Sequence, residues 1–256
     1  MKKALFYLII FLAVQIVCTY AVMLIWSWAS GTDMEEGLAT NASVVIISSA
    51  VYSLILLVMF LVCRWCVVER TYLRSRPYGV LFWVVIAALG TIIPSEWLAG
   101  QLDLPDNNAE LFQNIMAAPW GYLSICIFAP LVEEVVFRGA ILRSLLESYR
   151  PWIAIVVSAL FFAAAHFNLA QMPHAFLIGI LLGWMCWRTS SIIPGILFHW
   201  INNTVAYVLS NIYPGMNDLT FYELFGSDQR RILMAVGFSF CLLIPALLQL
   251  NLRMKK

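Results

Sequence analysis

Five polar side chains in the second half of the chain are of the types that hydrolyse an amide bond. They are, in chain order, Glu133, Glu134, His166, His199 and Asn203. A carboxylate can take a proton from water, and an imidazole can share that task or bind a metal ion. A second histidine beside a carboxamide can donate hydrogen bonds to a developing oxyanion. The combination predicts a hydrolytic site.

The paired glutamates also have a simpler interpretation. Glu134 and Arg138 are four residues apart, so they share a helix face and can form an ion pair. If a membrane span ended near residue 132, Glu133 and Glu134 would only begin an interfacial helix. Pro130, however, removes one backbone hydrogen bond and is expected to kink the helix just before the pair. Such a kink frees a carbonyl and admits water, which suits a reaction site.

The other polar residues are open to similar alternatives. His166 alone could be a packed or an interfacial histidine, and His199 with Asn203 could form a polar clamp between helices. Asn202 points about 100° away from Asn203 on the same helix and is the weaker candidate. His174 stands at the start of an apolar segment, which is typical of an interfacial residue.

Several other kinds of site find no support in the sequence. No G-x-S-x-G nucleophile elbow occurs, no H-E-x-x-H zinc motif occurs, and none of the six cysteines falls within the polar patterns. Cys63 and Cys66 form a CxxC in an apolar, helical segment, which indicates two small hydrophobic residues rather than a redox pair or zinc knuckle. The net charge of +1, without a basic patch, gives no indication of nucleic-acid binding.

The composition indicates that the elements carrying these residues lie in a membrane. Of the 256 residues, 62% are apolar and 11% are charged, whereas soluble domains carry about 25% charged residues. Apolar runs of spanning length without period-two alternation favour helices over a barrel. We therefore expect an all-α polytopic bundle of about eight transmembrane helices, at roughly 4–29, 43–66, 79–99, 119–146, 151–168, 171–188, 190–212 and 230–252.

The distribution of charge predicts the orientation of these spans. With the N-terminus in the cytoplasm, all basic residues except Arg230 and Arg231 fall on the cytoplasmic side, and most acidic residues fall on the other. The positive-inside rule predicts this pattern for eight spans with both termini cytoplasmic. The first apolar run follows Lys2 and Lys3 but is too long for a signal peptide, so we interpret it as a retained span. We expect an integral protein of the cell (inner) membrane.

We expect one integral membrane domain over residues 1–256, with the catalytic helices at 119–212. The polar, acidic stretch of roughly 100–118 is interpreted as a loop. Gly179 and Gly183 form a GxxxG motif, which suits close packing of helices.

Three motifs, each on its own predicted span, resemble the CPBP family of intramembrane proteases. The motifs are EExxxR (Glu133, Glu134 and Arg138), FxxxH (Phe162 and His166) and HxxxN (His199 and Asn203). The family comprises type II CAAX prenyl endopeptidases and Abi-like proteins, which process bacteriocins or confer immunity to them. The resemblance covers roughly residues 119–212.

The resemblance implies an eight-helix bundle with its site inside the membrane. Glu133 would be the general base, His166 would help it to activate water, and the adjacent glutamate–arginine pair would support the site. His199 and Asn203 would form the oxyanion hole. In an alternative version, Glu133, His166 and His199 would bind a divalent metal such as zinc, with a metal-bound water as the attacking group. The sequence leaves both versions open.

Three functions compete for this set of residues. The first is an endopeptidase that cuts a membrane-associated peptide or protein in the bilayer, with prenylated CaaX termini, leader peptides and membrane regulators as open substrate classes. The second is a non-catalytic immunity or scaffold protein, which would predict decay of a motif residue, and none is missing. The third is a proton-coupled transporter, which would show repeated halves with broken helices, whereas the polar residues here lie only in the second half. We therefore predict the endopeptidase.

Overall fold

The computed structural model of the chain describes residues 1–31, 41–66, 72, 77–102, 104–106, 108–213, 215 and 219–254. Every long element within these residues is a helix, and no strand occurs among them. The prediction of an all-α chain is therefore confirmed. The elements are α1 (Lys2–Ser30), α3 (Ala42–Val62), α5 (Tyr78–Gly100), α6 (Ala109–Ala117), η1 (Leu123–Phe128), α7 (Ala129–Glu133), η2 (Glu134–Leu142), α8 (Arg143–Leu146), α9 (Pro151–Ala164), α10 (Met172–Thr189), α11 (Ile193–Ile212), α12 (Phe221–Leu224) and α13 (Gln229–Arg253).

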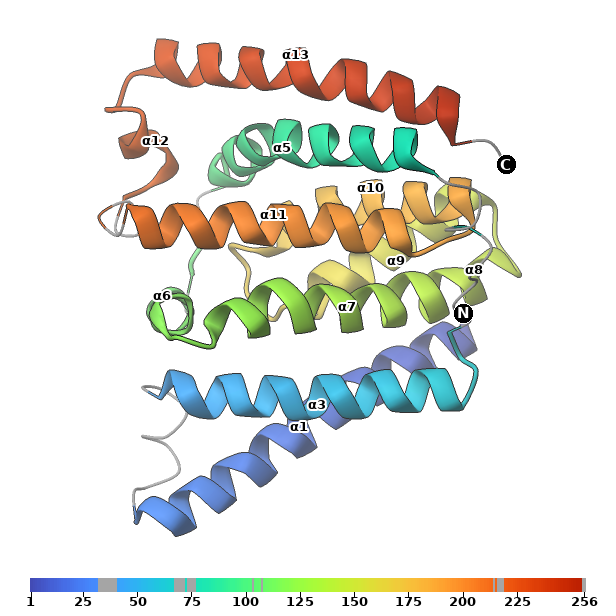
Figure 1. Cartoon of the computed structure of the whole chain (residues 1–256), viewed down its shortest axis with the longest axis vertical. Helices are drawn as coiled ribbons and strands as arrows, with labels where there is room; N and C mark the ends of the chain where they lie inside the picture. Colours follow the sequence, from blue (N-terminus) through green and yellow to red (C-terminus); the bar gives the residue numbers. More distant parts are fainter. Residues whose placement is uncertain are drawn as a thin grey trace.

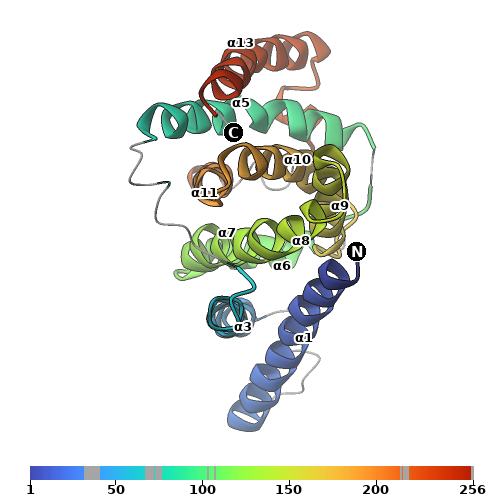
Figure 2. The same cartoon turned by 90° about the vertical axis from the view of Figure 1, so that its right-hand side faces the viewer.

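The long helices lie side by side as a bundle of rods (Figure 1). α5 and α13 lie at one edge, α1 and α3 lie at the opposite edge, and the continuous segment from η1 to α8 lies between them with α9, α10 and α11. The view in Figure 2 shows that α1 runs obliquely, so that one of its ends stands away from the rest of the bundle. The start of α1 and the end of α13 lie at the same side of the molecule in Figure 1.

Four of the described helices are long and apolar enough to cross a membrane, namely α1, α3, α5 and α13. The chain is therefore an integral membrane protein, while the count of eight spans, the orientation of the termini and the identity of the membrane stay predictions. The other expected spans have shorter or more polar helices: α9 has 14 residues, and the fourth expected span is divided into η1, α7, η2 and α8. Some of the charged residues used to predict the orientation lie outside the described residues: Asp33, Glu35, Glu36, Arg70, Arg74, Arg76, Asp103, Asp218, Lys255 and Lys256.

Two clusters of buried apolar side chains hold the bundle together. One cluster joins α1, α3, η2 and α9, the other joins α5, α11 and α13, and α10 contributes to both. Gly179 and Gly183 of α10 face α9, where an added Cβ would lie 3.0 Å from Cβ of Ala159 and 3.1 Å from Cγ2 of Ile155, respectively. The GxxxG motif thus permits the close helix packing that was predicted for it.

The CxxC motif does not lie in a helix, which corrects the sequence-based interpretation. α3 ends at Val62 rather than near residue 66, and Cys63 and Cys66 lie in the turn that follows. Arg64 in this turn has a positive φ of 56°, which ends the helix. Both cysteines are free thiols, and Cys63 is exposed whereas Cys66 is buried.

The stretch predicted as a loop contains a helix, which is a second correction. α6 is amphipathic and buries Ile115 and Met116, while its other residues are more exposed. The carbonyl of Met116 accepts a hydrogen bond from Nδ2 of Asn211 at 3.1 Å, which ties α6 to α11. The sequence pattern did not predict this helix because only one narrow face of it is apolar and the surrounding residues are polar.

Candidate active site

The glutamate pair follows Pro130, which interrupts the backbone hydrogen bonds of its helix. Residues Leu123–Phe128 form a π-helix, in which N–H groups bond to carbonyls five residues earlier, as the N–H of Ala129 does to Ser124. The next bond in this pattern would run from residue 130 to Ile125, but proline has no N–H. Nδ2 of Asn203 donates to the Ile125 carbonyl instead, at 2.9 Å. The predicted freeing of a carbonyl by Pro130 is thus confirmed, and Asn203 occupies that carbonyl.

Glu134 and Arg138 form an ion pair that is completely buried. Oε1 of Glu134 lies 2.7 Å from Nη1 of Arg138, and both side chains have 0% exposure. Nη2 of Arg138 also donates to the carbonyl of Gly179 on α10, at 3.4 Å. The Glu134–Arg138 pair is therefore enclosed by the bundle, while the alternative of an interfacial helix stays open because burial does not place the segment relative to the membrane.

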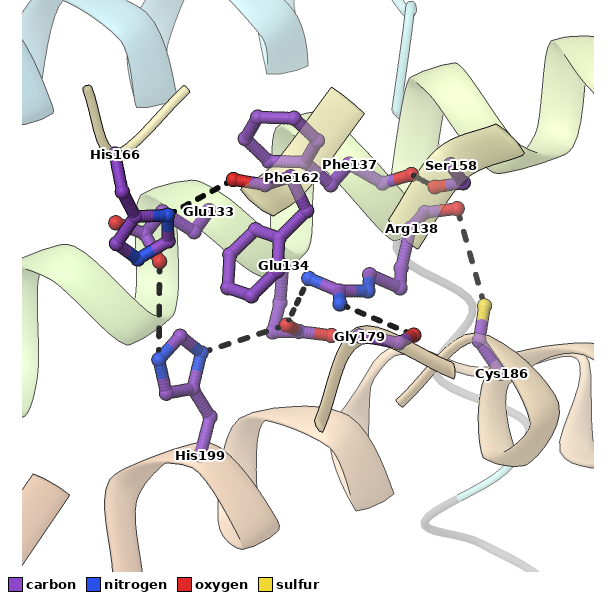
Figure 3. Close-up of polar contacts among 10 residues, drawn as sticks. All are labelled: Glu133, Glu134, Phe137, Arg138, Ser158, Phe162, His166, Gly179, Cys186 and His199. Carbon is purple, nitrogen blue, oxygen red and sulfur yellow. Dashed lines mark hydrogen bonds and ion pairs between the residues drawn. The ribbon is translucent and has the colours of Figure 1, made fainter. Parts of the chain in front are cut away.

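His199 of α11 lies between the two glutamates (Figure 3). Its Nε2 is 3.7 Å from Oε2 of Glu133, and its Nδ1 is 3.5 Å from Oε1 of Glu134. Glu133 differs from Glu134 in that 18% of its side chain remains exposed. Adjacent helical residues point about 100° apart, so Glu134 faces Arg138 while Glu133 faces an open space.

Gly195 allows α11 to approach this carboxylate pair. A Cβ at this position would overlap Oε2 of Glu134. Oε2 is itself buried and has no hydrogen-bond partner among the described residues. The close approach of the α11 backbone is therefore part of how His199, one turn further along, reaches both glutamates.

His166 lies in the turn after α9 and not within a helix as its expected span of 151–168 implied. α9 ends at Ala164, and Phe167 has a positive φ of 49°, a strained conformation for a non-glycine residue. Nδ1 of His166 lies 2.8 Å from the carbonyl oxygen of Phe162. Because a carbonyl oxygen only accepts, Nδ1 carries the hydrogen, and Nε2 of the neutral ring carries a lone pair.

Phe162 connects the three motifs through its ring as well as its carbonyl. The ring lies over the guanidinium of Arg138, with 4.3 Å from Cζ to the ring centroid. It also meets His166 and His199 edge-on, at centroid distances of 4.9 and 5.8 Å. Both histidine rings are therefore packed against one fixed aromatic surface.

Glu133 and His166 line one cavity of about 180 Å³. The cavity wall also contains two polar residues that the sequence motifs did not include, Gln15 of α1 and Tyr52 of α3. The remaining lining residues are Phe11, Phe137, Phe162 and Ala165. Gln15 could have been noticed as a carboxamide in the middle of an apolar run, but nothing in the sequence indicates which other helix that side chain meets.

His174 and Asn202 belong to a separate polar chain. Nδ1 of His174 lies 2.9 Å from Oε1 of Glu96, and its Nε2 lies 3.4 Å from Nδ2 of Asn202. This chain links α5, α10 and α11, and none of its three residues lines the cavity beside Glu133. His174 thus has partners inside the bundle, and its interpretation as an interfacial residue is incomplete.

The arrangement of these side chains bears on the alternative of a metal centre. Within the described part of the chain, no group of three His, Cys, Asp or Glu side chains is arranged to hold a metal ion. Glu133, His166 and His199 do not form such a group in this arrangement. Nδ1 of His166 is bonded to the carbonyl of Phe162, and Nδ1 of His199 lies 3.5 Å from the carboxylate of Glu134.

Comparison with known proteins agrees with the three motifs. Residues 115–205 match the type II CAAX prenyl endopeptidase Rce1-like family, and this segment contains all seven motif residues. The chain is also 28% identical over 190 residues to an uncharacterized 24.3 kDa protein of Escherichia coli, an alignment that covers 68% of this chain and 85% of that protein. No solved structure matches the chain. The resemblance to the CPBP family is therefore confirmed for the segment that carries the site.

Proposed function

We propose that the protein is an intramembrane endopeptidase that hydrolyses a peptide bond of a membrane-associated protein or peptide. One observation carries the proposal: Glu133 and His166 line a common cavity, while His199 of α11 lies 3.7 Å from Glu133. A cavity with a carboxylate and an imidazole inside an apolar bundle has room for water, which hydrolysis requires. The match to a family of CAAX endopeptidases supports the same reaction class.

In the proposed reaction, Glu133 is the general base. Its carboxylate takes one proton from a water molecule as the water oxygen attacks the carbonyl carbon of the scissile bond. The lone pair on Nε2 of His166 accepts a hydrogen bond from the other water hydrogen, since Nδ1 is committed to the Phe162 carbonyl. The two groups therefore orient the water as well as activate it.

His199 and Asn203 stabilise the oxyanion that this attack creates. Nδ1 of His199 lies 3.5 Å from Oε1 of Glu134, and its Nε2, which lies 3.7 Å from Oε2 of Glu133, is the atom proposed to donate to the oxyanion. The NH₂ group of Asn203 has two hydrogens, and only one of them is used in the bond to the Ile125 carbonyl. The other is proposed to donate to the oxyanion.

Collapse of the tetrahedral intermediate completes the reaction. The carbon–nitrogen bond breaks, Glu133 returns its proton to the departing nitrogen, and the products are a carboxylic acid, which ionises, and an amine. Each step uses groups of this chain.

The test uses the purified, detergent-solubilised protein and a library of membrane-proximal peptides that includes prenylated C-termini, leader peptides and segments of membrane regulators. Wild type is compared with Glu133→Gln, and Glu147→Gln is the matched control because Glu147 is 56% exposed and pairs with Lys3. We expect cleavage by wild type and Glu147→Gln and none by Glu133→Gln. Cleavage is expected to persist in the presence of a chelator.

The three histidines provide a second comparison within the same assay. His166→Ala and His199→Ala are expected to lose activity, because His166 lines the cavity and His199 lies against both glutamates. His174→Ala is expected to retain activity, because His174 lies against Glu96 and Asn202 instead. If neither wild type nor any variant cleaves a peptide across the library, the immunity or scaffold function would be preferred. Loss of cleavage with a chelator would favour the metal version.

A further inference from the structure

The cavity beside Glu133 is closed on one side by helices that lie outside the family-matched segment of residues 115–205. α1 contributes Gln15 and α3 contributes Tyr52 to this wall. Tyr52 lies close enough to Gln15 and to Glu133 to interact with both side chains. The part of the cavity wall that lies outside the motif residues therefore carries polar groups of its own.

The chemistry of this wall suits the backbone of a peptide. A carboxamide offers both donors and acceptors, and a phenol offers one donor and an acceptor. A peptide bond inside a helix is shielded, because its carbonyl already bonds to the N–H four residues on. A substrate must therefore be extended where it is cut, and in a membrane each backbone group exposed by unwinding needs a new partner.

We infer that Gln15 and Tyr52 are positioning residues that hold the extended backbone of the substrate peptide across the cavity from Glu133 and His166. This inference rests on the proposed function and adds the substrate-facing groups that the three motifs lack. The substrate class it implies is a peptide segment that is unwound, or readily unwinds, at the scissile bond. Segments with glycine or proline near that bond meet this requirement, because both residues weaken a helix.

A purely structural role as a clamp between α1 and α3 explains these residues less well. These two helices already pack through aromatic side chains near one end, where Tyr7 and Phe60 have a centroid distance of 5.9 Å. Phe6 and Trp65 meet there at 5.5 Å. Gln15 and Tyr52 instead have their side chains on the cavity that contains Glu133.

The kinetic test compares Tyr52→Phe and Gln15→Met with wild type on the peptides that wild type cleaves. Each variant removes hydrogen-bonding groups and keeps the approximate size of the side chain, so kcat/KM is expected to fall about tenfold, mainly through KM. The effects are expected to be less than multiplicative in the double variant, because the two side chains contact each other. Tyr20→Phe is the control, since Tyr20 lies on α1 and is 57% exposed. Unchanged kinetic constants in both variants, or a lower thermal stability alone, would overturn the inference.

A binding test separates this inference from the proposed catalysis. p-Benzoylphenylalanine is placed at Gln15 in the Glu133→Gln protein and irradiated with the same peptide library. Val17, which is 65% exposed on α1, is the control position. Peptide capture at position 15 but not at position 17 supports the inference even if wild type cleaves nothing. Absence of capture at position 15, with normal cleavage by Tyr52→Phe, overturns the inference and leaves the proposed endopeptidase intact.

Discussion

Nδ2 of Asn203 donates a hydrogen bond to the backbone carbonyl of Ile125 at 2.9 Å, across two helices. This carbonyl receives no backbone hydrogen bond from the π-helix, because the residue five positions later is Pro130, which has no N–H. Asn203 thus has a structural task in addition to the oxyanion contact proposed for it. The two tasks can be separated, because a backbone N–H at position 130 could bond to the Ile125 carbonyl in place of Asn203.

Asn203→Ala is expected to lower both stability and activity. It leaves the Ile125 carbonyl without a partner, which costs about 1 kcal/mol in the free energy of unfolding. Adding Pro130→Ala supplies an N–H to that carbonyl, so the double variant is expected to regain most of the lost stability while activity stays low. Thermal unfolding in detergent and peptide cleavage measure the two effects. Recovery of activity in the double variant would show that Asn203 acts only through the backbone.

The buried ion pair of Glu134 and Arg138 is expected to respond unequally to single and double changes. Arg138→Ala leaves a buried carboxylate without its cation, which costs about 3–5 kcal/mol. Replacing both residues, as Glu134→Leu with Arg138→Met, is expected to restore stability but not activity, because His199 would lose the carboxylate beside its Nδ1. Denaturation in detergent and the cleavage assay test this.

The exposed pair of Lys3 and Glu147 is the control for the ion-pair prediction. Its N–O distance is 3.2 Å, but its side chains are 69% and 56% exposed. Lys3→Ala is therefore expected to change stability by less than about 1 kcal/mol. If the double variant Glu134→Leu with Arg138→Met is as unstable as Arg138→Ala, the unpaired carboxylate of Glu134 is not the cause of the stability loss.

The positions of two long helices and the pairing of Glu134 with Arg138 were predictable from the sequence. The expected spans 79–99 and 230–252 correspond to Tyr78–Gly100 and Gln229–Arg253, because long apolar runs between polar stretches leave few other choices. The four-residue spacing of Glu134 and Arg138 required them to share a helix face, and the structure joins them.

The details that shape the site could not be predicted in the same way. The same residues can form an α-helix or a π-helix, and the outcome at η1 depends on Asn203, a partner 78 residues away. The turn at His166 depends on Phe167 adopting a positive φ, which phenylalanine does not favour by itself. Gln15 and Tyr52 carry no motif, and only the packing of α1 and α3 brings them to the cavity.

We expect the aromatic ring of Phe162 to contribute to activity in addition to its backbone carbonyl. Phe162→Leu keeps the carbonyl that orients His166 but removes the ring from Arg138 and from both histidines. We expect a stability loss of about 1–2 kcal/mol and a fall in kcat, with little change in KM. Phe238→Leu is the control, because Phe238 is 78% exposed on α13. A Phe162→Leu protein with unchanged kcat would show that the carbonyl suffices.

Gly195 is expected to tolerate no side chain, because a Cβ there would overlap Oε2 of Glu134. Gly195→Ala should lose about 1–3 kcal/mol through overpacking and most of its activity, since α11 would carry His199 away from the glutamates. Gly237→Ala is the matched control, because nothing lies within 4 Å of a Cβ at that helical position. Shortening the carboxylate with Glu134→Asp in the Gly195→Ala background should recover part of the lost stability, as measured by thermal unfolding. If the shortened carboxylate recovers nothing, the contact between Gly195 and Glu134 is not what limits the approach of α11.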